Sequence, residues 1–102
     1  MAQRVRPTTP VEDIATAHAQ HIVAGDAAAI TQDCALNVLQ TPADLYAQLV
    51  ATTFERYAVV GHAKIGLQHV FKIRYVGATV VTLHHRLGET GGKWLVLESE
   101  RV

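Results

Sequence analysis

Hydrophobic positions along the chain change their spacing once, from a helical period in the first half to a period of two in the second. Ile14, His18 and Ile22 recur at four-residue intervals, which predicts one narrow buried face on a helix over residues 10–24. A capping pattern of Thr, Pro and Glu opens this segment, and Gly25 is suited to end it in a left-handed conformation. The first element is therefore expected to be a helix with a histidine on its buried face.

Two further helices are expected before the spacing changes. Asp26 can cap a short helix that reaches about residue 32, and an apolar segment at 35–40 is expected to form a brief strand. Thr41-Pro42-Ala43-Asp44 repeats the capping pattern and predicts a third helix that ends near Tyr57. The apolar stripe of this third helix comprises Tyr46, Leu49, Val50, Thr53, Phe54 and Tyr57.

Alternation with a period of two then predicts a half-buried strand over 63–76, bent at Gly66. Its inward face carries Ile65, Leu67, His69, Phe71, Ile73 and Tyr75. A second strand over 78–87 is followed by a hairpin loop over 88–92 and a last strand over 93–102. The inward face of the second strand carries Val81, Leu83, His85 and Leu87.

The last strand can face either way. A four-residue hairpin loop would pair Leu87 with Trp94, and a five-residue loop would reverse the strand. We favour the first register, which places Trp94, Val96 and Glu98 inside. In either register two large apolar residues stay on the outer face of the sheet, and such an exposed pair is typical of a surface that binds a second copy of the chain.

Helices followed by an antiparallel meander indicate an α+β domain, with N-terminal helices packed on the concave face of a curved antiparallel sheet. Residues 9–102 are expected to form this single domain, after a flexible tail over 1–8. The composition is 49% hydrophobic and 18% charged, which fits a packed core and excludes a disordered chain.

Charge and cysteine usage narrow the classes of partner. The formal net charge is zero and no segment is strongly basic, so we expect no nucleic-acid partner. No apolar run approaches the ~20 residues that span a bilayer, and the first residues lack the apolar core of a signal peptide, so we expect no membrane partner. Cys34 is the only cysteine, so no internal disulfide can form and a cytoplasmic location is expected.

Four features occur in a fixed order: Ala24-Gly25-Asp26 after the first helix, Ile30 in the second, Pro42 before the third, and Gly91-Gly92-Lys93-Trp94 in the final hairpin. In this order they resemble the NTF2-like superfamily of cone-shaped, cystatin-like α+β domains, which includes ketosteroid isomerases and SnoaL-like polyketide cyclases. The resemblance covers residues 10–102. It implies a pocket between the helices and the sheet, and a homodimer through the sheet.

The best-known active site of that family transfers poorly to this chain. His18 stands where ketosteroid isomerases carry a tyrosine that helps to bind the oxyanion. Gln40 and Thr41, beside Pro42, stand where those enzymes have a general-base aspartate. Leu83 stands near the position of their second, protonated acid. The resemblance therefore argues against proton abstraction beside a carbonyl by that mechanism.

The candidates for catalysis are His18, His85 and Glu98. An imidazole titrates near neutral pH, and burial raises the pKa of a carboxyl group. A pair of Glu98 with His85 or with His18 is therefore the best acid/base arrangement that these residues offer. Each also has a structural interpretation, as a hydrogen-bonded core histidine or as a solvated glutamate at a sheet edge.

The residues expected to line the pocket are His18, Phe54, Tyr57, His69, Leu83, His85 and Trp94. No metal site and no cofactor are expected, because neither HExxH or paired-cysteine spacing nor a glycine-rich phosphate loop occurs. Three functions stay open: binding of a small apolar molecule, a SnoaL-like cyclase, isomerase or hydrolase that uses histidine and glutamate as acid and base, and a homodimerising assembly domain without a functional pocket.

Overall fold

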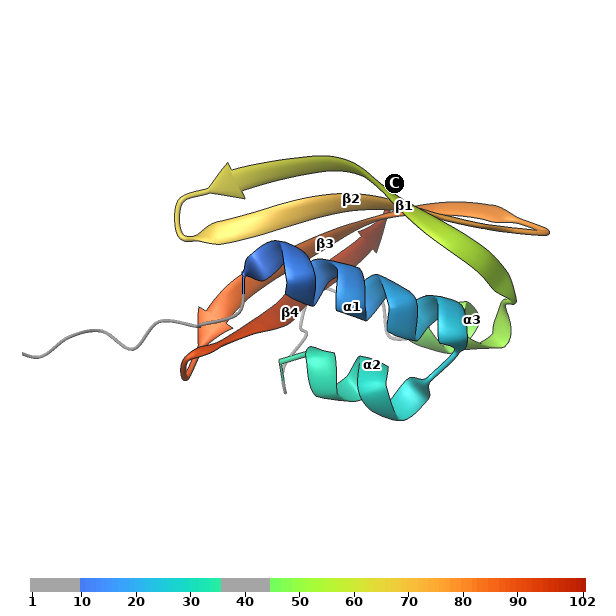
Figure 1. The fold of residues 1–102 in the computed structure, drawn as a ribbon, viewed down its shortest axis with the longest axis horizontal. Helices are drawn as coiled ribbons and strands as arrows, with labels where there is room; N and C mark the ends of the chain where they lie inside the picture. Colours follow the sequence, from blue (N-terminus) through green and yellow to red (C-terminus); the bar gives the residue numbers. More distant parts are fainter. Residues whose placement is uncertain (1–9, 36–44) are drawn as a thin grey trace, which may run out of the picture.

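The computed structural model describes residues 10–35 and 45–102. These residues form three helices followed by a sheet of four antiparallel strands in the order β1-β2-β3-β4. The elements are α1 (Val11–Ala24), α2 (Ala27–Asp33), α3 (Leu45–Ala51), β1 (Phe54–Ile65), β2 (Gln68–Gly77), β3 (Val80–Thr90) and β4 (Lys93–Arg101). The helices pack on one face of the curved, open sheet, and α1 crosses the strands (Figure 1). The predicted α+β class is therefore confirmed.

The core lies between α1 and the inner face of the sheet. Ala15 and Ala19 are fully buried on α1, and their small side chains let the helix backbone approach the strands closely. The strands contribute larger side chains, which include Ile73, Tyr75, Leu83, Leu87 and Val96. Burial of this apolar surface is the main force that holds the two layers together.

The turn between α1 and α2 follows the predicted capping chemistry. Gly25 has φ 68°, and its N–H donates to the Ile22 carbonyl at 3.1 Å. The Asp26 N–H donates to the His21 carbonyl at 3.0 Å, which completes a Schellman motif. The Asp26 carboxylate then accepts from the Ala29 N–H at 3.1 Å and caps α2. This tight turn lays α2 beside α1 and brings the end of α2 back toward the middle of α1.

The predicted extent of the third helix is wrong. Helix α3 ends at Ala51, and Phe54 and Tyr57 belong to β1. Bulges in β1 between Phe54 and Arg56 and between Val59 and Gly61 interrupt the alternation of side chains, so the strand lacks the period of two that would have identified it.

The predicted long strand over 63–76 is also wrong, because it contains the turn between β1 and β2. Gly66 has φ 62°, and Ile65 pairs with Gln68 across a two-residue turn. A glycine at the first central position is typical of a type II′ hairpin. Ile65 and Leu67 were expected inside, but they flank or form the turn and are 61% and 69% exposed.

The last hairpin has a two-residue loop, which is shorter than either predicted loop. Gly91 and Gly92 have φ 58° and 81°, as a type I′ turn requires. Leu87 therefore pairs with Val96 rather than with Trp94. Val96 is fully buried and Trp94 partly buried, so both face inward as the favoured register predicted.

A bulge at Leu97 then reverses the facing of the rest of β4. The pairing shifts from Leu87 with Val96 to Arg86 with Glu98, so one extra residue is inserted in β4. Ser99 consequently lies opposite His85 on the inner face. The predicted inward orientation of Glu98 is wrong for this reason.

Other predictions fall on residues 1–9 or 36–44 and lie outside the described part of the chain. They concern the tail over 1–8, the cap at Thr9, the strand over 35–40 and the cap before the third helix. At the border of this segment, Cys34 forms a parallel bridge with Val96, and the Ala35 N–H donates to the Val96 carbonyl at 2.9 Å. The end of α2 is thus attached to the last strand.

Candidate functional site

A chain of hydrogen bonds runs from the molecular surface into the core between the helices and the sheet. It begins at Asp33, whose Oδ2 atom accepts from His21 Nδ1 at 2.6 Å and from His18 Nδ1 at 2.7 Å. His21 is about one-third exposed, whereas His18 is 1% exposed. His18 Nε2 lies 3.1 Å from the Tyr46 hydroxyl. The hydrogen bonds from Asp33 to Tyr46 therefore join all three helices.

The remaining hydrogen bonds of this series join the helices to the sheet. The Tyr46 hydroxyl lies 2.5 Å from Ser99 Oγ, which in turn lies 2.7 Å from His85 Nδ1. His85 Nε2 lies 2.8 Å from the Tyr75 hydroxyl. His85 is 1% exposed, and Ser99 and Tyr75 are fully buried. We call the six residues from Asp33 through His18, Tyr46, Ser99 and His85 to Tyr75 the buried network.

Each member reaches the network through a local feature of the chain. His18 and His21 lie one turn apart on α1, so both rings can reach the same carboxylate. The polypeptide reverses direction at Gly25, so α2 lies beside α1. Asp33, the last residue of α2, is thereby placed next to the two histidines. The bulge in β4 turns Ser99 inward to meet His85.

Burial and hydrogen bonding move the pKa values of the network in opposite directions. Burial alone would raise the pKa of Asp33, but hydrogen bonds from His18 and His21 and their charges bring it below its usual value. Burial, together with the charges of His18 and His84, holds the pKa of His85 well below its usual range. Burial also raises the pKa of Tyr46 and of Tyr75. At neutral pH the network therefore contains an ionised Asp33, a neutral His85 and neutral phenols.

The available partners, together with these protonation states, define the direction of the inner hydrogen bonds. Within the described residues His85 Nε2 is the one hydrogen-bond partner of the Tyr75 hydroxyl, so the buried phenol proton is satisfied only when it is donated to that nitrogen. A neutral His85 then carries its own proton on Nδ1 and donates it to Ser99 Oγ. Among the described residues, no buried side-chain nitrogen or oxygen lacks a hydrogen-bond partner. The network is thus a satisfied part of the core rather than a strained one.

Two of the predicted catalytic residues meet in this network. The rings of His18 and His85 pack edge to face with centroids 5.0 Å apart. Glu98 lies on the outer face of the sheet, where its carboxylate is 3.5 Å from the Arg86 guanidinium. The acid that pairs with His18 is Asp33 instead.

The pattern of the sequence did not single out Tyr46, Ser99 or Asp33 as partners of the histidines. Tyr46 carried a signal, because its place on the apolar stripe of a helix predicted burial and a buried phenol needs a hydrogen-bond partner. The role of Ser99 depends on the bulge in β4, and that of Asp33 depends on the way α2 packs beside α1.

The other predicted pocket residues are dispersed. Phe54 and Leu83 are buried in the core. His69 and Trp94 pack edge to face with centroids 5.4 Å apart, in a separate cluster at the end of the sheet that carries the β1–β2 and β3–β4 turns (Figure 1). Tyr57 lines an open cleft between α1 and β1.

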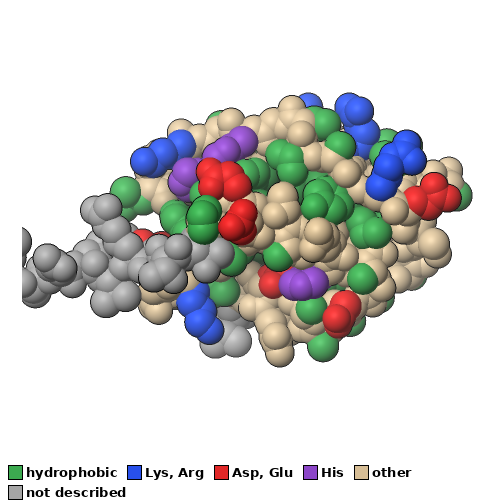
Figure 2. All heavy atoms as spheres, in the orientation of Figure 1, with side chains coloured by type: hydrophobic (Ala, Val, Ile, Leu, Met, Phe, Trp, Pro, Cys, Tyr) green, Lys and Arg blue, Asp and Glu red, His purple; other side chains and the backbone are tan. Residues whose placement is uncertain are grey.

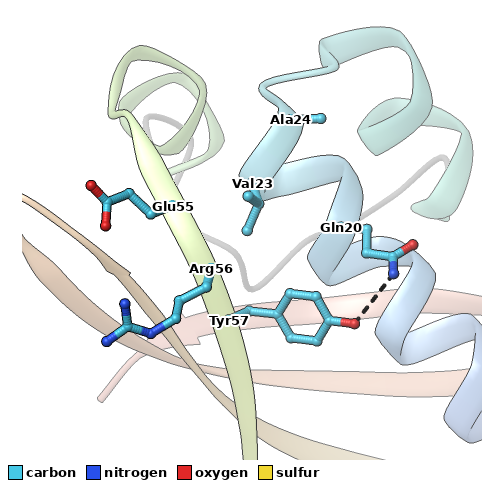
Figure 3. Close-up of a pocket in the computed structure, with 6 residues that line it drawn as sticks. All are labelled: Gln20, Val23, Ala24, Glu55, Arg56 and Tyr57. Carbon is cyan, nitrogen blue, oxygen red and sulfur yellow. Dashed lines mark hydrogen bonds between the residues drawn. The ribbon is translucent and has the colours of Figure 1, made fainter.

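The cleft that contains Tyr57 has a volume of about 340 Å³ (Figure 3). It is lined by Gln20, Val23, Ala24, Glu55, Arg56 and Tyr57. A second cleft, of about 260 Å³, lies between α2 and α3. It is lined by Ala27, Ile30, Thr31, Tyr46, Ala47 and Val50. His18, His69, His85 and Glu98 line neither of the two clefts.

Comparisons with models of protein families, with curated proteins and with solved structures find no match to this chain. Within residues 10–35 and 45–102, no helix has the length and apolar character needed to cross a membrane.

Proposed function

We propose that this domain binds a small apolar molecule in the cleft between α1 and β1. The observation that carries the proposal is the cleft itself, an open space of about 340 Å³ between a helix and the sheet. Ligand sites typically have volumes of about 300–1,000 Å³, mostly apolar walls and a few polar groups. This cleft is at the small end of that range, which favours a ligand with few heavy atoms.

The orientation of the lining side chains favours an uncharged ligand. In Figure 3 the Tyr57 ring projects from β1 toward α1, while the Glu55 and Arg56 side chains point away from the helix. The apolar surfaces of Val23 and Ala24 lie on the α1 side of the cleft. The space between the two elements is therefore bordered by apolar side chains and an aromatic ring, with the charges directed outward.

One polar pair can orient the ligand. The Gln20 amide donates to the Tyr57 hydroxyl at 3.5 Å, which is a long hydrogen bond and therefore a weak one. A ligand with a single hydroxyl or carbonyl group can bind between these two groups and replace that bond at little cost. The expected ligand is thus apolar with one polar atom at its inner end.

The buried network supports this cleft from behind. His18 lies on the buried side of α1, and its hydrogen bonds to Asp33 and Tyr46 fasten the helix that forms one wall. Both nitrogens of His18 and both nitrogens of His85 are engaged within the network. This engagement favours a structural role for the two histidines and favours binding over catalysis.

An acid/base enzyme is the second candidate, because Asp33 orients His18 as a carboxylate orients a catalytic imidazole. Such a role requires a substrate to displace Tyr46 from His18 Nε2. Three further statements also remain proposals. They are membership of the NTF2-like superfamily, a cytoplasmic location and a homodimer through the outer face of the sheet.

The binding proposal is tested by thermal unfolding in the presence of indole, p-cresol and decanol, since a ligand of the folded state raises the unfolding midpoint. Val23 and Val50 are both half-buried valines on helices, and each lines one of the two clefts. Val23 points into the space between α1 and β1 in Figure 3, so Val23→Trp is expected to fill this cleft and abolish the shift, whereas Val50→Trp in the other cleft is expected to preserve it. A shift that survives Val23→Trp, or the absence of any shift, would contradict the proposal.

A further inference from the structure

Two histidines outside the buried network face each other at the turn between β1 and β2. His62 on β1 and His69 on β2 lie on the inner face of the sheet, and His62 Nε2 is 2.8 Å from His69 Nδ1. His62 is exposed and His69 is partly buried. Histidine side chains reach the surface in separate places on the face that carries α1 (Figure 2). This pair is therefore accessible to solutes, in contrast to His18 and His85.

Aromatic side chains from two strands, β2 and β4, hold the two rings. The His62 ring stacks on Phe71, with centroids 4.0 Å apart and planes inclined by 15°. The His69 ring packs edge to face against Trp94, with centroids 5.4 Å apart. Phe71 is buried, so the platform beneath His62 belongs to the core. Each imidazole is consequently packed against an aromatic side chain although the pair lies near the surface.

The separation of the two nitrogens suits a metal ion. Imidazole nitrogens bind zinc and similar ions at about 2.0–2.1 Å. Two such nitrogens at right angles around one ion are separated by about 2.9 Å, from the same bond length. The observed 2.8 Å is close to this separation, so chelation requires the rings to tilt until their lone pairs converge, with little change in the distance between them.

We propose that His62 and His69 form a binding site for a divalent late transition-metal ion such as Ni²⁺ or Cu²⁺. These ions prefer imidazole ligands and bind nitrogen donors more tightly than the earlier first-row metals do. In the metal-free pair, one nitrogen donates its proton to the other. On metal binding that proton moves to the second nitrogen of the same ring, so a neutral pair binds the ion without losing a proton.

Two charged groups of opposite sign act on the pair. They are Lys64 on β1 and Glu12 on α1. Within residues 10–35 and 45–102, no group of three or more His, Cys, Asp or Glu side chains is placed to hold a metal ion. Water is expected to complete the coordination, and affinity should be lower than at a site with three protein ligands.

Trp94 provides a direct readout, because it is the only tryptophan of the chain and touches His69. NiCl₂ and CuCl₂ are titrated into the full chain at pH 7.5 in a non-chelating buffer, and tryptophan fluorescence is followed. We expect saturable quenching with one ion per chain. His62→Gln and His69→Gln are each expected to weaken binding by at least about tenfold.

The matched control is His84→Gln, which removes a partly exposed histidine from the opposite face of the sheet. It is expected to bind as tightly as the parent chain. Quenching that does not saturate, or that persists unchanged in His62→Gln, would overturn the proposal.

A second readout uses the parent chain alone and does not depend on the folding of a variant. Addition of Ni²⁺ is expected to broaden the imidazole NMR signals of His62 and His69 before those of His21 and His84. Broadening that begins at His21 or His84 would overturn the site. Neither experiment involves the α1–β1 cleft, so each outcome is independent of the proposed binding function.

Discussion

Two pairs of histidines in this molecule show how environment determines what the same side chain can do. His18 and His85 are buried, and every ring nitrogen is hydrogen-bonded to another side chain of the core. His62 and His69 lie near the surface and share one hydrogen bond with each other. The buried pair stabilises the contact between helices and sheet, whereas the surface pair can give up its shared hydrogen bond to bind a metal ion. Residue type alone does not distinguish these roles.

The largest expected effect comes from removing a buried histidine. His85→Leu leaves the Tyr75 hydroxyl without its hydrogen-bond partner in the core and removes one of the hydrogen bonds of Ser99 Oγ. Because an unsatisfied buried polar group costs about 1–3 kcal/mol, the free energy of unfolding should fall by at least about 2 kcal/mol. Urea unfolding followed by circular dichroism measures this change.

The surface pair supplies the control for that measurement. His62→Gln replaces an exposed side chain and is expected to change the free energy of unfolding by less than about 0.5 kcal/mol. If the two variants lose similar stability, the distinction between a structural pair and an accessible pair is wrong.

A smaller effect is expected from Tyr46→Phe, which removes the hydroxyl that joins the helical half of the network to the sheet. His18 Nε2 then loses its partner, and Ser99 loses one of its contacts. The expected cost is about 1–3 kcal/mol, because the ring still fills its place in the core. The same urea titration measures it, and an unchanged midpoint would show that water replaces the hydroxyl without loss.

The inward orientation of the histidines could be predicted from the sequence for the buried pair, but only in part for the surface pair. His18 and His85 were expected inside because they occupy buried positions of a helical and an alternating pattern. The cap at Asp26 and the stop at Gly25 were also predictable, since both depend only on neighbouring residues. Local chemistry was sufficient for these features.

The remaining features depend on contacts between distant segments. The bulges of β1 hide its alternation, so His62 was not assigned to an inner face. Because of the bulge at Leu97, Ser99 rather than Glu98 lies on the inner face opposite His85. No residue near Leu97 has a conformational preference that predicts the bulge. A bulge forms where it improves the match with a neighbouring strand, so its position follows from the assembled sheet rather than from the strand's own residues.

The pH dependence of the free energy of unfolding should also distinguish the buried histidine pair from the surface pair. An unfolded chain protonates His85 near pH 6.5, the usual pKa of histidine. Burial and the charges of His18 and His84 lower the pKa of His85 in the folded chain, so the folded state stays unprotonated there. The free energy of unfolding should therefore fall as the pH drops below 6.5, by at most about 1.4 kcal/mol per pH unit for this group.

Thermal unfolding between pH 8 and pH 5 measures this slope. Below about pH 4 a further loss is expected as Asp33 becomes protonated, because its pKa is lowered in the folded chain. His69 has a lowered pKa as well, so His69→Gln should reduce the slope slightly and His85→Leu should reduce it most. A slope that His85→Leu leaves unchanged would assign the effect to another group.

The smallest expected effect concerns the acid that the sequence pattern placed beside the histidines. Glu98→Gln breaks only the contact with Arg86 on the outer face of the sheet. The Arg86 side chain is 42% exposed and the two groups share one contact of 3.5 Å, so the pair is expected to contribute no more than about 1 kcal/mol and the urea midpoint should move little. A loss as large as that of Tyr46→Phe would indicate that Glu98 acts on the buried network.

The most direct test of the account is the protonation state of His85, because the whole buried network depends on it. Long-range ¹H–¹⁵N NMR spectra of the imidazoles between pH 5 and pH 8 report both the charge and the tautomer of each ring. We expect His85 to stay neutral throughout, with its proton on Nδ1 toward Ser99 and its Nε2 accepting from Tyr75. A His85 signal that titrates near pH 6.5, or one that carries its proton on Nε2, would contradict the account.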